Sequence, residues 1–467
     1  MAITRRQFIQ HTGLWAAGSF LGPRLLRQPL LQAALAQTIG DRYFVVVFLD
    51  GGNDGLNTVT PIADGASGTL RTAYEAARKT GVTGGLQLLA SDLTATMIGD
   101  DPHTGTPLAL HPGLTGLKSL YDSGKLAVIQ GCGYPAYNLS HDLSRKTWQT
   151  GMSPSQGGWM GRYLAANYSS GDVPAVNIRS QIAGEYVQNT TNVLAIQRLA
   201  QFGFPYDSFA PSDKSAKRTG FLSLCAEAAA APQSTVKYTG ESGNATLLSS
   251  ETYPAVSQLY THDRSSFNGM YPSTSLARDL REVAKVIYGV QQGVTGVNAR
   301  FFEVRNGGYD THSDQGTTGA TDQHNQLHQE VGNALEVFYN DCSDMGVATK
   351  LCVMVWSEFS RRIQQNANGT DHGSQGPVFV IGGSVTGGIY GNHPNINSAA
   401  LNKDGNTMYS QAAGDPYRST DFRDVYGTLL NHWLNMSPST ILSAVLPLDS
   451  GNPSSYWTTP NFDLGFV

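Results

Sequence analysis

Short, mostly apolar runs recur along the chain, and each ends abruptly in glycine or polar residues. The strongest run covers residues 43–49, with the sequence YFVVVFL, and comparable runs occupy residues 126–129, 299–304, 351–356 and 378–381. Runs of this length without polar alternation are typical of strands that are buried on both faces of a parallel sheet. The pattern therefore predicts a sheet of buried strands.

Apolar residues with the period of an amphipathic helix separate these runs. Such stripes cover residues 114–120, 276–287, 322–342 and 420–434, and a shorter helix is expected at residues 70–79. The repeated order of strand, helix and strand predicts an α/β fold. We expect a doubly wound, mostly parallel sheet that is sandwiched by helices.

Residues 150–275 have the least regular pattern. Within them, residues 205–255 are rich in Ser, Thr, Ala and Gly and show weak periodicity. We interpret this region as a cap or lid that is inserted into a single α/β domain covering residues 37–467.

Composition narrows the class of protein. Only 14% of the residues are charged, the formal net charge is −5, and 52 residues are glycine. A nucleic-acid-binding protein would show a basic face, so this class is disfavoured. The cysteines lack the close paired spacing of a zinc–thiolate site, and they permit a disulfide without requiring one. They are Cys132, Cys225, Cys342 and Cys352.

The amino terminus predicts export. Residues 4–9, TRRQFI, resemble a twin-arginine signal, and a modestly apolar segment follows at residues 13–21. Small residues at positions 34 and 36 predict cleavage before Gln37. Residues 1–36 would then be the signal peptide, and the twin-arginine translocase would be a partner. We expect a periplasmic or secreted protein. No later segment approaches the roughly 20 apolar residues that a membrane anchor needs. A cytosolic amphipathic helix is the alternative interpretation of this terminus.

Acidic and imidazole side chains follow several of the predicted strands. In open α/β folds such side chains meet at the carboxyl edge of the sheet. Carboxylates that meet there repel one another unless a cation or protons compensate, and oxygen and nitrogen ligands suit divalent metals. The alternatives are an Asx turn for the first carboxylate and a loop-holding role for the glutamate. The predicted metal ligands are Asp50, Asp310, His312, Glu358, Asp371 and His372.

A second set of residues offers catalytic groups. Ser140 fits the N-cap of a helix that runs to about residue 150, and it is either a plain cap or a nucleophile near the positive end of the helix dipole. His141 is a ligand, a base or a core histidine. Arg361 and Arg362 are either an anion clamp or a solvated pair. Residues 324 and 328 are histidines at i and i+4, and we interpret them as surface residues rather than as a metal pair.

Eight motifs then occur in a fixed order. They are TRRQFI, VVVFLDGGNDGLNTVTP, LHPGL, NLSHD, GGYDTHSDQ, WSEFSRR, NGTDHG and TDFRDVY. Their combination resembles the bacterial family called domain of unknown function 1501, over nearly the whole mature chain. That family is grouped with the alkaline phosphatase and sulfatase superfamily. The resemblance therefore implies an α/β sandwich with a metal site at the strand ends.

The same resemblance assigns roles to single residues. It implies that Asp50 is the first metal-binding aspartate and Ser140 the nucleophile. Asp310 and His312 would form the Asp-plus-His pair, with Glu358 and His372 as the later ligands. This chain departs from the superfamily in the short spacing from Asp310 to His312. It also has Phe359 where the superfamily has a histidine, which weakens or removes one of two metal positions.

These observations favour an exported metal-dependent hydrolase of phosphate or sulfate esters. It would use one or two divalent ions (zinc, manganese, calcium or magnesium) and act on an anionic small molecule or polymer. Ser140, or less favourably Thr58 or a metal-bound water, would attack, with His141 and Arg362 as the other catalytic groups. A non-catalytic periplasmic binding or assembly protein on a degenerate scaffold is the main alternative. A metal-free serine hydrolase is disfavoured because the chain has no G-x-S-x-G motif.

Overall fold

The computed structural model describes most of the predicted mature chain. It covers residues 40–467 except 67–68, 80–83, 170, 189–191, 204–209, 269, 397–413, 417, 449–456 and 458. The predicted signal peptide at residues 1–36 lies outside the described residues. Within the described ranges, no helix has both the length and the apolar character to cross a membrane.

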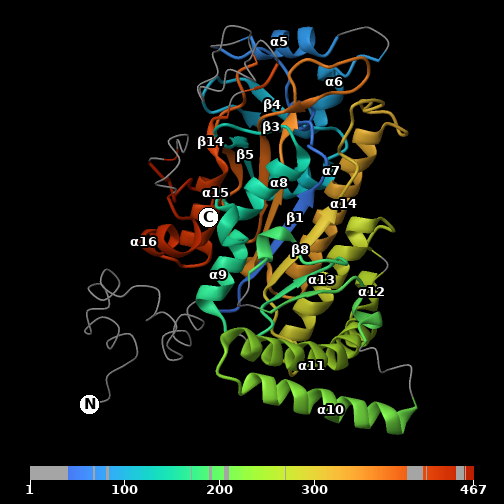
Figure 1. Cartoon of the computed structure of the whole chain (residues 1–467). Helices are drawn as coiled ribbons and strands as arrows, with labels where there is room; N and C mark the ends of the chain where they lie inside the picture. Colours follow the sequence, from blue (N-terminus) through green and yellow to red (C-terminus); the bar gives the residue numbers. More distant parts are fainter. Residues whose placement is uncertain are drawn as a thin grey trace, which may run out of the picture.

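A mostly parallel sheet forms the centre of the molecule (Figure 1). In spatial order its strands are β13 (Gly388–Tyr390), β5 (Leu126–Gly133), β12 (Gly376–Ile381), β9 (Leu351–Trp356), β1 (Tyr43–Leu49), β8 (Phe301–Asn306), β6 (Ala175–Asn177) and β7 (Val193–Ala195), with β14 (Thr420–Asp421) paired to β5. Of these strands, β12 runs antiparallel to both of its neighbours. The predicted α/β class is confirmed.

The strand β1 is central because it pairs in parallel with β8 on one side and β9 on the other. All seven of its residues are buried, as the unbroken apolar run predicts. Its side chains alternate between two cores, since successive residues of a strand point to opposite faces. Val45 and Val47 belong to one core, and Phe44, Val46 and Phe48 belong to the other.

Helices cover both faces of this sheet (Figure 1). The core on the Val45 face includes residues of α7 (Thr115–Asp122), α13 (Ser275–Gln291) and α14 (Gln323–Asp344). The core on the Phe44 face includes residues of α8 (His141–Thr150), α9 (Trp159–Asn167) and α15 (Phe422–Thr428), and a π-helical turn, Leu429–Trp433, continues α15.

Smaller elements surround the carboxyl edge of the sheet. A three-stranded sheet has the order β2, β4, β3, and a two-stranded ribbon pairs β10 with β11. These elements and the short helices near them are α4 (Gly55–Thr58), β2 (Val59–Pro61), α5 (Leu70–Ala77), α6 (Ala90–Leu93), β3 (Met97–Asp100), β4 (Pro107–Leu110), β10 (Ser360–Arg361) and β11 (His372–Gly373).

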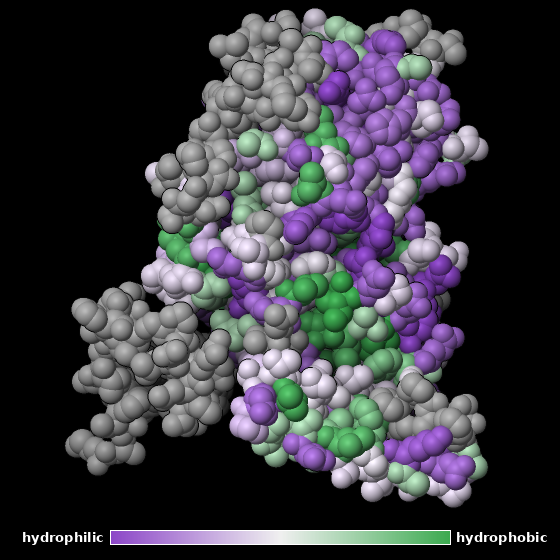
Figure 2. Space-filling model, in the orientation of Figure 1, coloured by the Kyte–Doolittle hydropathy of each residue, from purple (hydrophilic) through white to green (hydrophobic). Residues whose placement is uncertain are grey.

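The region with weak periodicity forms a helical hairpin. Its helices are α10 (Pro211–Ala229) and α11 (Ser234–Asp263), and α11 packs against α13. Of the residues of α10, Cys225 is the one that is buried, which explains why the sequence shows no clear apolar stripe. The hairpin lies at the end of the molecule opposite α5, and apolar and polar side chains mix on its surface (Figures 1 and 2). All four cysteines are buried and free.

Candidate metal centre

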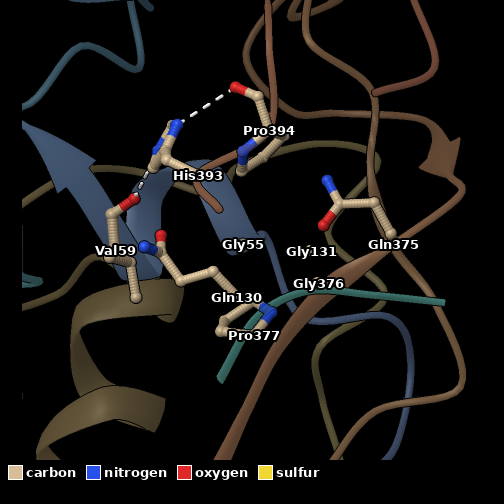
Figure 3. Close-up of a pocket in the computed structure, with 9 residues that line it drawn as sticks. All are labelled: Gly55, Val59, Gln130, Gly131, Gln375, Gly376, Pro377, His393 and Pro394. Atoms are coloured by element: carbon tan, nitrogen blue, oxygen red, sulfur yellow. Dashed lines mark hydrogen bonds between the residues drawn. The ribbon is translucent and has the colours of Figure 1, made fainter. Parts of the chain in front are cut away.

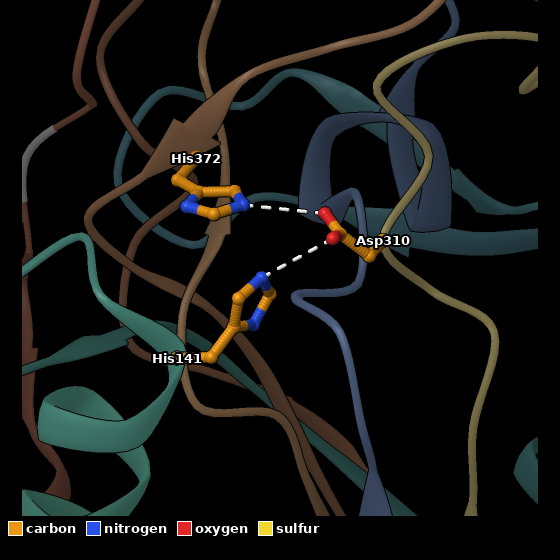
Figure 4. A group of neighbouring side chains, drawn as sticks. All are labelled: His141, Asp310 and His372. Carbon is orange, nitrogen blue, oxygen red and sulfur yellow. Dashed lines mark hydrogen bonds and ion pairs between the residues drawn. The ribbon is translucent and has the colours of Figure 1, made fainter.

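Three loops at the carboxyl edge of the sheet bring the centre together. The loop after β8 carries Asp310, the segment after β5 leads into His141 at the start of α8, and the segment after β9 forms the ribbon that carries His372. Because β5, β8 and β9 run in the same direction, their carboxyl ends share one edge. Ligand atoms of these three residues all lie within 4.8 Å of one another (Figure 4).

His141 is held by a buried carboxylate. Its Nδ1 lies 2.8 Å from Glu358 Oε1, so the Nδ1–H donates to Glu358. The Nε2 atom therefore points inward, 3.4 Å from Asp310 Oδ2. It is buried and has no hydrogen-bond partner among the described residues. The hydrogen bond to Glu358 raises the pKa of His141, although burial opposes it.

Two more histidines have the same arrangement. His372 donates from Nδ1 to the carbonyl oxygen of Leu139 at 2.6 Å, and its Nε2 lies 3.2 Å from Asp310 Oδ1. His312 donates from Nδ1 to Asp371 Oδ1 at 3.1 Å. The Nε2 of His312 lies 3.1 Å from Asp310 Oδ1 and 2.9 Å from the Nε2 of His372. Three Nε2 atoms thus converge on one carboxylate.

The atoms that converge here all carry lone pairs of electrons. With each Nδ1 used as a donor, each neutral imidazole presents an Nε2 lone pair to its neighbours. Burial raises the pKa of Asp310, but the hydrogen bond and charge of Arg361 outweigh burial and hold that pKa at about 2. The carboxylate is therefore ionised at neutral pH. Facing lone pairs and a carboxylate repel unless a cation or a proton lies between them, so the donor set fits a divalent metal.

The structure gives Glu358 and Asp371 a different role from the predicted one. Both were predicted as metal ligands, but they accept the outer Nδ1–H groups of His141 and His312. Glu358 is fully buried and also accepts the main-chain N–H of Gly51 at 3.0 Å. Its oxygens are thus occupied by donors from the chain. Carboxylates that orient a histidine in this way support a metal site without binding the metal.

The glycines after β1 allow this close packing. Gly51 has φ +122°, and an added Cβ there would lie 2.4 Å from the main-chain nitrogen of Asp310. Gly52 has φ +80°, and its Cβ would lie 2.3 Å from the ring of Phe359. Larger residues would therefore push the Asp310 loop away from the Glu358 segment.

Asp50 was predicted as a metal ligand, but its side chain has other partners. It forms an ion pair with Arg305 and lies 3.5 Å from Arg145 Nη1. In the described part of the chain its carboxylate is not in the group formed by His141, Asp310 and His372. Asp50 follows the last residue of β1 and turns towards α8, which carries Arg145, and towards the end of β8, which carries Arg305.

Of the predicted catalytic residues, Ser140 lies beside the centre. It is the N-cap of α8, its side chain is exposed, and it makes no side-chain cap hydrogen bond. Its neighbours in the chain are Leu139, which holds His372, and His141. Thr58, the less favoured nucleophile, is buried and donates to the carbonyl oxygen of Asp54, so it is not available to attack a substrate.

The two arginines after Phe359 differ from each other. Arg361 is fully buried and donates to the carbonyl oxygens of residues 51, 52, 309 and 370 as well as to Asp310 Oδ1. The interpretation of Arg361 as a clamp on an anion is therefore wrong, because the N–H donors of Arg361 are used by acceptors within the protein. Arg362 is partly exposed and pairs with Asp415 at 3.6 Å. Phe359 packs against the rings of His141 and His372, at centroid distances of 4.9 and 4.5 Å.

Two histidines expected at the surface are buried. His324 and His328 lie under the edge of the sheet beside His111, with ring centroids 4.1 to 5.4 Å apart. Burial lowers the pKa of all three imidazoles, which keeps them neutral. The buried face of α14 is wider than its aliphatic residues indicate, because it also includes His324 and His328. The apolar pattern therefore did not predict this cluster.

A small pocket lies elsewhere on this edge (Figure 3). His393 closes one side, and its Nδ1 and Nε2 contact the carbonyl oxygens of Pro394 and Val59 at 3.1 and 3.3 Å. The residues that line the pocket are Gly55, Val59, Gln130, Gly131, Gln375, Gly376, Pro377, His393 and Pro394, none of which belongs to the group of imidazoles.

Comparisons with known proteins add a family. Residues 132–408 match the family described as "Protein of unknown function (DUF1501)". No curated protein matches the chain. One similar solved structure is the lipoteichoic acid synthase LtaP from Listeria monocytogenes, with 9% identity and a TM-score of 0.31 over 78% of this chain and 74% of that one. Another is the PsFucS1 sulfatase from Pseudoalteromonas sp., with 13% identity and a TM-score of 0.34 over 88% and 74%.

Proposed function

The chain belongs to the DUF1501 family, whose description assigns no activity, and from that premise we propose that it is an exported metal-dependent hydrolase of phosphate or sulfate esters. One observation carries the proposal. The Nε2 atoms of His141, His312 and His372 lie 3.4, 3.1 and 3.2 Å from the ionised carboxylate of Asp310, while each of the three outer Nδ1 atoms has an acceptor. Metal-binding histidines are usually anchored in this way.

The residues would divide the work as follows. His141, Asp310, His312 and His372 would hold the ion, which would supply Lewis acidity towards an ester oxygen. Ser140 would attack the phosphorus or sulfur atom, the bond to the alcohol oxygen would break, and the serine proton would go to the departing alcohol. Water would then hydrolyse the serine ester and restore Ser140. The start of α8 favours the anionic group of the substrate, because main-chain N–H groups point out of the helix there. Arg362 would offset negative charge at the rim of the site.

Export from the cytoplasm is the second part of the proposal. It is supported by residues 4–9, TRRQFI, which lie outside the described part of the chain. The twin-arginine route would place the protein in the periplasm or outside the cell. Cell fractionation of a variant with both arginines changed to lysine tests this half of the proposal, and unchanged export would contradict it.

Elemental analysis and an ester screen test the enzyme. Protein purified without chelator is expected to carry at least about 0.5 equivalents of a divalent ion, because a preformed ligand set retains its metal. The double variant H312A/H372A should lose the ion, whereas H262A, which removes an exposed histidine, should keep it. Phosphate monoesters, phosphate diesters and sulfate esters form the screen, with S140A as the inactive control. The proposal would be contradicted if the purified protein contained no metal and if added zinc, manganese or calcium did not activate it.

A non-catalytic binding or assembly protein is the second candidate. It is favoured by the side chain of Asp50, which pairs with Arg145 and Arg305 instead of joining the imidazoles. In that case the S140A variant would retain the biological phenotype, whereas substitutions on the surface of the α10–α11 hairpin would abolish it. Loss of the phenotype in S140A would reject this candidate.

A further inference from the structure

Two arginines meet on one carboxylate beside the candidate metal centre. Arg305, at the end of β8, pairs with Asp50, and Arg145 of α8 lies 3.5 Å from the same carboxylate. The arginine side chains are more exposed than the aspartate, at 41% and 25% against 12%. The guanidinium groups thus form the outer side of the cluster and Asp50 the inner side.

The cluster adjoins the centre through the chain. Arg145 follows His141 by one turn of α8. Arg305 lies on the strand that leads into Asp310, and the main-chain N–H of Tyr309 donates to the carbonyl oxygen of Asp50 at 3.2 Å. A ligand bound at the imidazoles would therefore extend towards the arginines along α8.

Two carboxylates, Asp50 and Asp142, balance the two guanidinium charges of this cluster, and Asp142 does so from an exposed position. Two guanidinium groups share Asp50, and Arg145 also pairs at 2.7 Å with Asp142, a side chain that is 90% exposed. Exposed ion pairs of this kind contribute little and separate readily in water. Each guanidinium has five N–H donors in a planar arrangement that matches phosphate or sulfate oxygens. In the part of the chain that the structure describes, the side-chain partner seen for Arg305 is Asp50.

We propose that Arg145 and Arg305 bind a second sulfate or phosphate group of the substrate, next to the group that is hydrolysed. This inference rests on the proposed function, and it makes the substrate an ester that carries at least two anionic groups. Asp50 holds the two guanidinium groups in place before the substrate arrives. It also competes with the anion for their N–H donors, so its charge sets the affinity of this subsite.

Binding of matched ligands to the full-length, zinc-loaded protein tests the subsite. The ligands are a monosulfated and a disulfated form of one disaccharide, and a singly and a doubly phosphorylated form of one sugar, each measured by isothermal titration calorimetry. The R305Q variant is expected to lower the affinity for the doubly charged ligand about tenfold relative to the singly charged one. The R145Q variant should act in the same direction. The pair of ligands that shows the larger effect identifies sulfate or phosphate as the preferred group.

Two further variants sharpen this test. The D50N variant removes the competing carboxylate and is expected to raise the affinity for the doubly charged ligand. The R198Q variant is the control, because Arg198 is similarly exposed, at 34%, and pairs with Asp279 away from the centre. If R145Q does not fold, R305Q, which changes the more exposed arginine, and D50N still decide the question.

The outcomes separate this inference from the proposed function. The subsite alone is overturned if the protein binds zinc and hydrolyses esters, but R305Q and R198Q have the same ratio of affinities for the doubly and the singly charged ligand. A protein that binds no metal and hydrolyses nothing, but loses its preference for doubly charged ligands in R305Q, supports the anion subsite and rejects the hydrolase.

Discussion

At the scale of single residues, the outer nitrogen of each histidine determines what its inner nitrogen can do. His141, His312 and His372 use Nδ1 as a donor to Glu358, Asp371 and the carbonyl oxygen of Leu139 respectively. Their Nε2 atoms are then left to face Asp310. Two of the carboxylates predicted as metal ligands, Glu358 and Asp371, thus support imidazoles instead.

Changing Glu358 to Gln tests that supporting role. A glutamine amide would place N–H groups against the N–H donors of Gly51 and Gly52, so it cannot accept all the hydrogen bonds that the carboxylate accepts. We expect metal affinity to fall roughly 10- to 100-fold, measured by competition with a chelating dye. The D122N variant, which changes an exposed aspartate of α7, is the control. Equal affinities in E358Q and the unaltered protein would contradict the role.

A buried glutamate away from the centre predicts a pH dependence of stability. Burial, followed by the nearby charge of Glu185, raises the pKa of Glu303 from its ordinary 4.5 to about 8, although Arg179 opposes this. In the folded protein the side chain is therefore neutral at low pH. Its contribution to the free energy of unfolding is present below pH 4.5 and is lost as the pH rises through about 8, because the unfolded chain releases this proton earlier.

The E303Q variant should remove this pH dependence. An amide keeps the oxygen that accepts from Arg179 at 2.8 Å but has no proton to lose. Between pH 5 and 8.5 the free energy of unfolding of the unaltered protein should fall more steeply than that of E303Q, by roughly 3 kcal/mol, in urea titrations. The E227Q variant on exposed α10 should follow the unaltered protein. Parallel profiles for E303Q and E227Q would rule out this effect.

At the scale of elements, close approach of helices fixes the layer on the Val45 face of the sheet. The helices α7 and α14 touch at Gly116 and Gly332. An added Cβ on Gly116 would lie 2.2 Å from the carbonyl oxygen of Gly332, which is main-chain and cannot rotate away. Because α14 begins after the loop that carries Asp310 and His312, this contact also determines where that loop ends.

The G116A variant is expected to separate the two helices. Overpacking of this kind costs roughly 1–3 kcal/mol in the free energy of unfolding, which chemical denaturation measures. The matched control is G220A in α10, where a Cβ meets nothing within 4 Å. Alanine is the better helix former, so G220A should stabilise the protein by roughly 0.5–1 kcal/mol. The contact would be unimportant if both variants changed stability in the same direction.

At the scale of the whole molecule, the candidate functional residues lie at one edge of the sheet. The candidate centre, the arginine pair and the small pocket all lie at or beside the carboxyl ends of the strands. The α10–α11 hairpin packs against α13 at the far end (Figure 1). Such a division is typical of open α/β sheets, in which ligands bind outside the carboxyl ends of the strands.

Much of this architecture could be predicted from the chain alone. The run at residues 43–49 is β1 with the predicted bounds, and the run at 351–356 is β9. Ser140 is the N-cap of α8 as expected. Asp310, His312 and His372 lie together, as their positions after strands predicted. Burial of Arg361 could not be predicted, because its acceptors are carbonyl oxygens of three separate segments.

The sequence by itself determined where buried strands occur and which polar residues follow them, because apolar periodicity and chain order are local properties. Only the tertiary structure decided which of those polar residues face one another. The direction of Asp50, Glu358 and Asp371 depends on donors that distant segments supply: Arg145 and Arg305, the imidazole of His141, and the imidazole of His312. A carboxylate turns to the donors within its reach, and folding alone sets which donors those are.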